Sequence, residues 1–164
     1  MKKQAVIILA ALCASAPMTF AAVPRKLNAF PEGERLVYTR LVEAFRNNQV
    51  AQVKSERAIL ERNYPLSVHL DNAYYMSGML EFQNLRYAEA LKDFSVVRNR
   101  YPKSNKRPSA MLASAVTYQK LNLSPLAHRV FQGIMKEYPG SPESQRAWMQ
   151  LKMLNKAPKV KAVR

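Results

Sequence analysis

The 164-residue sequence contains one cysteine, two histidines and four glycines, and each scarcity argues against a class of chemistry. Cys13 lies in a segment that we expect to be removed, so the mature chain would have no thiol for a disulfide, a nucleophile or a metal ligand. His69 and His128 are far apart and share no metal-ligand spacing. The glycines are scattered and form no phosphate-binding loop. We therefore expect no enzyme, no cofactor and no metal site.

Residues 1–22 have the pattern of a cleavable signal peptide. The charged start MKK precedes the apolar run AVIILAALCA, and the small residues Thr19 and Ala21 suit cleavage after Ala21 or one residue later. The run is too short to span a bilayer core of about 30 Å comfortably. An uncleaved anchor and a lipid anchor on Cys13 stay open as alternatives, although Leu12 stands where lipid-attachment signals carry a small residue. The pattern looks bacterial and predicts a periplasmic or secreted protein without a transmembrane segment in its mature chain.

A Tyr-Pro pair recurs every 37 residues, in YPLS, YPKS and YPGS, which begin at Tyr64, Tyr101 and Tyr138. Equal spacing with a shared serine is not expected by chance, and a period of 20–50 residues is typical of stacked repeats. Between successive Tyr-Pro pairs lie two apolar-rich segments, one with clear helical periodicity. Proline then ends the second segment, because it cannot continue a helix. Each unit is predicted to be helix, turn, helix, proline, with Ser124 and Ser141 as helix N-caps before a proline.

This layout resembles the tetratricopeptide repeat (TPR) family, in which small residues let paired helices approach and bulky residues fill the holes between them. The first unit departs from the family's pattern, because Val53 and Arg57 stand where alanine and phenylalanine are usual. In the other units, the resemblance implies that the following residues hold the repeats together: Tyr74, Gly78, Ala90, Phe94, Pro102, Ala115, Ala127, Phe131, Pro139 and Trp148.

The resemblance implies an all-α, right-handed α-solenoid of about three helix pairs plus a C-terminal capping helix. We expect the domain over residues 33–155, after a linker at 23–32 and before a basic tail at 156–164. The helix pairs would span about 34–66, 71–103 and 108–140, and the cap 142–155 would bury Trp148, Leu151 and Leu154. The period and the YPxS ending look most like TPR modules of bacterial envelope proteins, of the Tol-Pal-associated and outer-membrane-assembly types.

In the TPR family, the first helix of each pair lines a concave groove that holds an extended or helical segment of a partner protein. Asn72 matches the asparagine that such grooves use to hold peptide backbone. The alternative is that individual residues pack only against the adjacent helix. We expect an interaction scaffold of an envelope or secretion assembly. The resemblance assigns the groove to Tyr38, Phe45, Asn72, Tyr75, Met79, Phe82 and Gln119, with Arg35, Val42, Ser109, Leu112 and Val116 at matching positions.

Acidic residues are also scarce, with 11 against 26 Lys and Arg and a net charge of +15, or +13 without Lys2 and Lys3. Residues 22–94 hold 10 basic and 9 acidic residues, whereas residues 95–164 hold 14 and 2. Such a field attracts anionic partners. Export argues against nucleic acid, as does the absence of aromatic residues from the basic tail. The predicted basic patch comprises Arg98, Arg100, Lys103, Lys106, Arg107, Lys152, Lys156, Lys159 and Lys161.

The charge supports an alternative function. The protein would be an envelope-associated structural factor whose basic half is held to an anionic surface, such as lipid head groups, lipopolysaccharide or peptidoglycan. A third interpretation is that the charge serves solubility alone.

Overall fold

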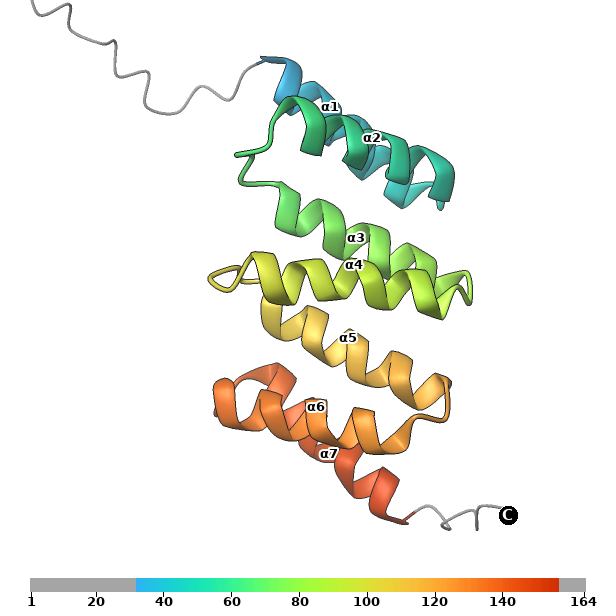
Figure 1. The fold of residues 1–164 in the computed structure, drawn as a ribbon, viewed down its shortest axis with the longest axis vertical. Coiled ribbons are helices and arrows are strands. Elements are labelled where there is room, and N and C mark those ends of the chain that lie inside the picture. Colours follow the sequence, from blue (N-terminus) through green and yellow to red (C-terminus); the bar gives the residue numbers. More distant parts are fainter. Residues whose placement is uncertain (1–31, 157–164) are drawn as a thin grey trace, which may run out of the picture.

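The computed structural model describes residues 32–156, which form seven helices and no strand (Figure 1). This confirms the all-α fold built from successive helix pairs. The predicted signal peptide, most of the predicted linker, and Lys159 and Lys161 lie outside the described residues, as does the side chain of Lys156. The helices are α1 (Glu32–Arg46), α2 (Val50–Asn63), α3 (Leu70–Gln83), α4 (Tyr87–Arg100), α5 (Arg107–Lys120), α6 (Ser124–Glu137) and α7 (Pro142–Lys156).

The helix boundaries follow the 37-residue period. The second helices begin at residues 50, 87 and 124, and α3 and α5 begin at residues 70 and 107. Each turn within a pair contains one residue with positive φ, namely Asn48 at 56°, Leu85 at 61° and Asn122 at 58°. A residue in this left-handed conformation ends a helix by letting the next amides bond back to its last carbonyls. The same local turn therefore recurs at the same place in every pair.

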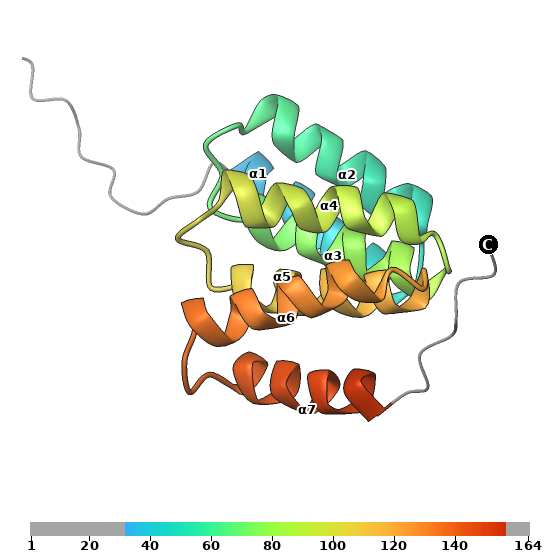
Figure 2. The ribbon, with the colours of Figure 1, turned by 60° about the horizontal axis from the view of Figure 1, so that its bottom comes forward.

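Consecutive helices pack against each other along the whole stack (Figures 1 and 2). Among the described residues, the close backbone contacts that skip a helix join α1 to α3, α3 to α5 and α5 to α7. The backbones of the even-numbered helices do not approach each other in this way, and α2 reaches α4 through long side chains such as Arg57. The odd-numbered helices are therefore closer together, so they form the inner, concave side of the solenoid.

Small residues allow the helices of a pair to approach. A Cβ atom added at Gly78 would lie 2.6 Å from Cε1 of Phe94, which leaves no room for an alanine without a shift. Ala90, Ala115 and Ala127 are fully buried, as are the Phe94 and Phe131 rings beside them. These are residues to which the resemblance assigns a packing role.

Two expectations about proline and serine need correction. Pro102 and Pro139 are exposed in the turns that follow α4 and α6, so they end helices but do not pack between repeats. Ser124 is the first residue of α6 and not its N-cap, a position held by Leu123 without a side-chain hydrogen bond. Ser141 does act as predicted, because its Oγ accepts a hydrogen bond of 3.0 Å from the Ser144 amide.

Trp148 is 48% exposed, so the expectation that it is buried is wrong. Its counterparts 37 and 74 residues earlier, Met111 and Tyr74, are buried against the second helix of their own pair. No described helix follows α7, so Trp148 has no such neighbour. The buried contact of α7 with α6 is made instead by Ala147 and Leu151. The large loss of stability that a buried tryptophan would imply is therefore not expected for Trp148→Ala.

Arg57 explains why the first pair departs from the repeat pattern. It occupies the position of Phe94 in the next pair, and its Nη1 lies 2.7 Å from Oδ1 of Asp93 in α4. Its guanidinium also lies over the Tyr74 ring, 4.4 Å from the centroid. Asp93 accepts a second hydrogen bond of 2.6 Å from Ser77 Oγ. An ion pair therefore joins the first repeat to the second where the later repeats use a phenylalanine core.

Two further carboxylates extend this polar contact. Glu61 accepts a hydrogen bond of 2.5 Å from the Tyr74 hydroxyl, which lowers the pKa of Glu61. Burial and this same bond raise the pKa of Tyr74 to about 12. Glu81 is fully buried and pairs with Lys54 at 2.5 Å and with Arg86. Burial by itself raises the pKa of Glu81, but the two cations bring it below its usual value.

Candidate partner-binding groove

The concave side contains a hollow of about 230 Å³ between α3 and α5, which α7 closes at one end. Its walls are mainly aliphatic, aromatic and sulfur-containing side chains. Apolar walls with a few polar groups are typical of sites that bind a ligand or a peptide. We call this hollow the groove, and its lining residues are Tyr75, Met79, Phe82, Ser109, Leu112, Ala113, Val116 and Arg146.

Three of the seven predicted groove residues line this hollow together. Tyr75, Met79 and Phe82 are spaced by four and three residues, so they project from one side of α3. All three are half-buried, because the helix packs beside them while the concave face stays open. Burial raises the pKa of Tyr75, and the nearby Glu143 raises it further. Its hydroxyl is thus a neutral hydrogen-bond donor in the groove.

The other predicted groove residues lie elsewhere on the concave side. Asn72 donates a hydrogen bond from its side-chain amide to the Tyr38 hydroxyl, so these two residues join α3 to α1. The Tyr38 ring also stacks on His69 with centroids 4.1 Å apart. Phe45 packs against the core of the first pair. Gln119 is half-buried. None of these four residues is among those that line the groove.

Arg146 is a groove residue that the sequence prediction missed. It belongs to α7, which was expected only to cap the stack, and it lies 37 residues after Ser109. Extending the repeat period into α7 would have identified it. Beside it, Glu143 accepts a hydrogen bond of 2.8 Å from Ser109 Oγ, which fixes α7 against α5. The α7 end of the groove therefore presents a guanidinium that has no ion pair with another described residue.

The predicted basic patch is not a uniform set of free charges. Arg100 pairs with Glu61 at 2.9 Å, and Arg107 pairs with Glu137 at 2.6 Å while also donating to the Tyr138 hydroxyl. The first ion pair joins neighbouring repeats and the second joins the two helices of one pair, and both reduce the charge available to a partner. Arg98, Lys103, Lys106 and Lys152 form no ion pair within the described residues.

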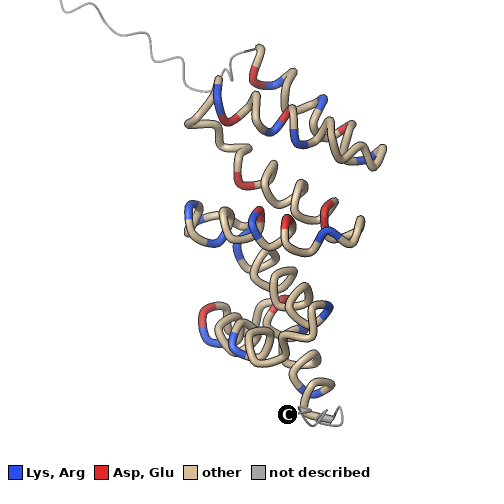
Figure 3. The backbone as a smooth tube through the Cα atoms, turned by 45° about the vertical axis from the view of Figure 1, so that its right-hand side comes forward, with Lys and Arg blue, Asp and Glu red and all other residues tan. Residues whose placement is uncertain are grey.

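The charge is unevenly distributed along the stack (Figure 3). Acidic and basic residues are interspersed over α1 to α4. From α5 to α7 the acidic residues are Glu137 and Glu143. The groove therefore opens beside the more basic half of the molecule.

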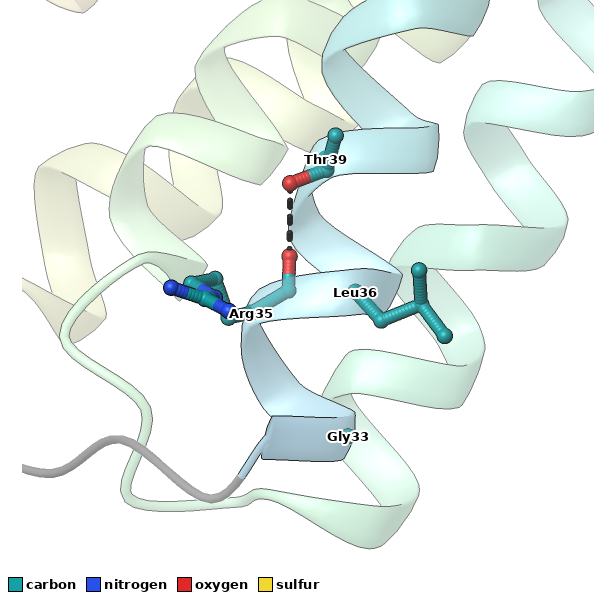
Figure 4. Close-up of a pocket in the computed structure, with 4 residues that line it drawn as sticks. All are labelled: Gly33, Arg35, Leu36 and Thr39. Carbon is teal, nitrogen blue, oxygen red and sulfur yellow. Dashed lines mark hydrogen bonds between the residues drawn. The ribbon is translucent and has the colours of Figure 1, made fainter.

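A larger hollow of about 720 Å³ lies at the other end of the stack, lined by Gly33, Arg35, Leu36 and Thr39 of α1 (Figure 4). Leu36 is 56% exposed, whereas its counterpart Ala73 is buried against the preceding helix α2. No described helix precedes α1, so its outer side is open. Thr39 Oγ1 donates to the Arg35 carbonyl at 2.8 Å, so its hydroxyl is already used within the helix.

Neither hollow is lined by a His, Cys, Asp or Glu side chain. Within residues 32–156, no three His, Cys, Asp or Glu side chains are grouped so that they could hold a metal ion. No helix of that range is long and apolar enough to cross a membrane.

Comparison with known proteins agrees with the repeat architecture. The family model described as a tetratricopeptide repeat matches residues 72–104, which include most of α3, all of α4 and the start of the turn after it. No curated protein matches the chain. Proteins of these repeats are generally non-enzymatic scaffolds for protein-protein interaction. Because the same helix pair recurs at 37-residue spacing on both sides of the matched segment, the match supports the tetratricopeptide repeat family for this chain.

Proposed function

We propose that this protein is an exported interaction scaffold whose groove binds a segment of a partner protein in an envelope or secretion assembly. The observation that carries the proposal is the groove itself, a concave apolar hollow formed by the first helices of two adjacent repeats. Half-buried apolar side chains such as Tyr75, Met79 and Leu112 lose their remaining water when a partner covers them, which favours binding. Export rests on the sequence of residues 1–22.

Methionine in the groove suits a partner with an irregular surface. Met79 has an unbranched, flexible side chain that adapts to different shapes. The aromatic rings of Tyr75 and Phe82 on either side are held by contacts with Phe94 and Tyr87, at centroid distances of 6.1 and 5.6 Å. The groove thus combines fixed rings with one adaptable side chain, a combination that binds an apolar segment of a protein.

Replacing Met79 and Leu112 with glutamate is expected to lower capture of envelope proteins by the immobilised mature protein at least tenfold. The change places two charges in a surface that becomes dry on binding, and burying an unpaired charge is costly. Capture from an envelope extract, followed by quantitative mass spectrometry, measures the loss. Leu126→Glu, at an exposed site on α6, is the matched control and should leave capture unchanged. Equal capture by the groove variant and the parent would refute the groove as the binding site.

The charge distribution favours a second candidate function, attachment to an anionic envelope surface through residues 95–164. This half has 14 basic and 2 acidic residues. Exposed charges act through a field that salt screens, with a Debye length of about 10 Å at 0.1 M. Attachment of this kind would weaken steeply with salt, whereas apolar binding in the groove would weaken much less.

Changing Lys103, Lys106 and Lys120 to glutamine is expected to reduce binding to anionic phospholipid vesicles severalfold at low salt. These lysines form no ion pair with described residues, so the fold should be unaffected. Co-sedimentation with vesicles at low and high salt measures the effect, and circular dichroism checks the fold. Unchanged vesicle binding at low salt would leave the groove as the proposed site of function.

A further inference from the structure

The last helix of the stack has an open apolar face. Along α7, residues spaced by three and four positions project from one side, and most of them are exposed. Trp148 and Met149 are each 48% exposed, and Met153 is 63% exposed. Trp148 and Met149 also border a hollow of about 420 Å³ that Met135 of α6 helps to line. We call this surface the open face, formed by Gln145, Trp148, Met149, Lys152 and Met153.

The repeat period shows what normally covers this face. Tyr74 and Met111 stand 37 residues apart, and Trp148 stands 37 residues after Met111. Tyr74 is buried against Phe94 of α4, and Met111 against Phe131 of α6. In both pairs the second helix therefore packs on the position that Trp148 occupies in α7. Trp148 therefore lies on the side of α7 where the second helix of a fourth pair would pack, whereas Met149 and Met153 continue the register of the groove residues Tyr75 and Met79.

The side chains of this face define the chemistry of a helix that could pack there. Lys152 occupies the position of Gly78 and Ala115, so its longer side chain would hold an incoming helix farther from α7 than the second helix lies in the complete pairs. Its Nζ lies over the Trp148 ring, 3.6 Å from the centroid, and it has no ion pair with a described residue. An incoming helix would therefore meet an apolar surface that carries one unneutralised cation.

We propose that the open face docks an amphipathic helix of a partner protein, with acidic side chains beside its apolar stripe. This goes beyond binding in the groove, because Trp148, Met149 and Lys152 do not line the groove. Charge complementarity identifies the occupant, since acidic side chains would neutralise Lys152. A second copy of α7 would place like charges together. Residues 157–164 also fit poorly, because they are basic and contain Pro158.

Two synthetic peptides test the proposal with the mature protein. The control peptide has the sequence of α6, residues 124–137, whose Phe131 and Ile134 form a suitable apolar stripe, with alanine at Gly133 to favour the helix. The acidic peptide is identical except that His128, Arg129 and Lys136 are replaced by glutamate. Trp148 is the chain's single tryptophan, so its fluorescence reports docking at the open face directly.

At low salt, the acidic peptide is expected to change Trp148 fluorescence saturably and to bind at least tenfold more tightly than the control peptide. Lys152→Glu should remove or reverse this preference, and replacing Met149 and Met153 with serine should weaken binding of the acidic peptide at least tenfold. The groove variant Met79→Glu should bind the acidic peptide like the parent, which separates this site from the groove. Each of these exposed α7 substitutions should leave the helical circular dichroism spectrum unchanged.

Three results would overturn the proposal. The first is that neither peptide changes Trp148 fluorescence at millimolar concentration. The second is equal binding of the two peptides, or a preference that Lys152→Glu does not alter, because charge would then not select the occupant. The third is self-association of the parent protein that the Met149 and Met153 variant abolishes. A second copy of the chain would then cover the open face.

Discussion

Replacing Phe94 with alanine is expected to lower the free energy of unfolding by about 3–5 kcal/mol, the usual cost of removing a buried aromatic ring. Phe94 is fully buried in the cluster that joins α3, α4 and α5, where its neighbours include Tyr74, Ala90 and Ala110. The ring is thus at the centre of the stack, and its removal leaves a cavity that three packed helices cannot close. Urea unfolding followed by circular dichroism measures the change.

Two matched variants make this prediction specific. Phe82→Ala removes the same side chain from a half-exposed site and should cost clearly less. Gly78→Ala should itself be destabilising, because its Cβ would lie 2.6 Å from the Phe94 ring. Combining Gly78→Ala with Phe94→Leu should cost less than the sum of the two single changes, since the smaller side chain relieves the overlap. A loss below about 1 kcal/mol for Phe94→Ala would mean that the ring is not in a close-packed core.

Arg57→Met is expected to lower the free energy of unfolding by about 3 kcal/mol at pH 7, because it removes one partner of a largely buried ion pair. The side chains of Arg57 and Asp93 are 19% and 11% exposed. Methionine retains most of the aliphatic stem, so the loss reports the charge more than the volume. The variant leaves the Asp93 carboxylate with the Ser77 hydroxyl as its remaining partner among the described side chains.

The cost of Arg57→Met should shrink as the pH falls. Burial raises the pKa of Asp93 even in the parent, where Ser77 and Arg57 oppose the effect, and loss of Arg57 raises it further. A carboxyl whose pKa is higher in the folded state binds a proton more tightly when folded. Its contribution to stability therefore improves as the pH falls through the folded pKa. Glu61 and Glu81 have lowered pKa values and act in the opposite direction in both proteins.

Urea unfolding of parent and variant at pH 7 and near pH 4.5 measures this difference. Arg57 also helps to lower the pKa of Glu61, so its loss narrows the gap in the same direction. The gap in unfolding free energy should narrow at the lower pH. Adding Asp93→Asn to Arg57→Met removes the main titrating group, so the gap between this double variant and Asp93→Asn should depend on pH only through Glu61, and therefore less strongly. A gap between Arg57→Met and the parent that stays constant with pH would show that Asp93 does not titrate in response to Arg57.

Much of the candidate groove could be predicted, but its limits could not. Tyr75, Met79 and Phe82 belong to one side of one helix, so helical periodicity alone brings them together. Asn72 and Tyr38 sit at groove positions by the same pattern, yet they bond to each other across two helices. That contact depends on the angle and distance between α1 and α3. Both quantities result from the packing of the two helices, so the sequence of either helix by itself does not predict them.

The basic patch also shows that the sequence does not predict which cationic side chains form ion pairs. A count of Lys and Arg correctly describes the excess in residues 95–164. It does not show that Arg100 pairs with Glu61 or that Arg107 pairs with Glu137, because these partners are 39 and 30 residues apart in the chain. Packing of helices, between repeats for Arg100 and within one pair for Arg107, brings the partners within hydrogen-bond distance, so the tertiary structure decides which charges remain available to a partner.

The sequence by itself determined the helix pairs, their 37-residue period, the turns between them and the small residues where helices cross. These features depend on a few neighbouring residues or on identical repetition, so each is encoded locally. The tertiary structure alone decided what covers each helix. Tyr74, Met111 and Trp148 occupy the same position of the repeat, but the first two are buried and Trp148 is exposed. The physical reason is that a side chain is buried only where a second surface packs against it. No described helix follows α7 to cover Trp148.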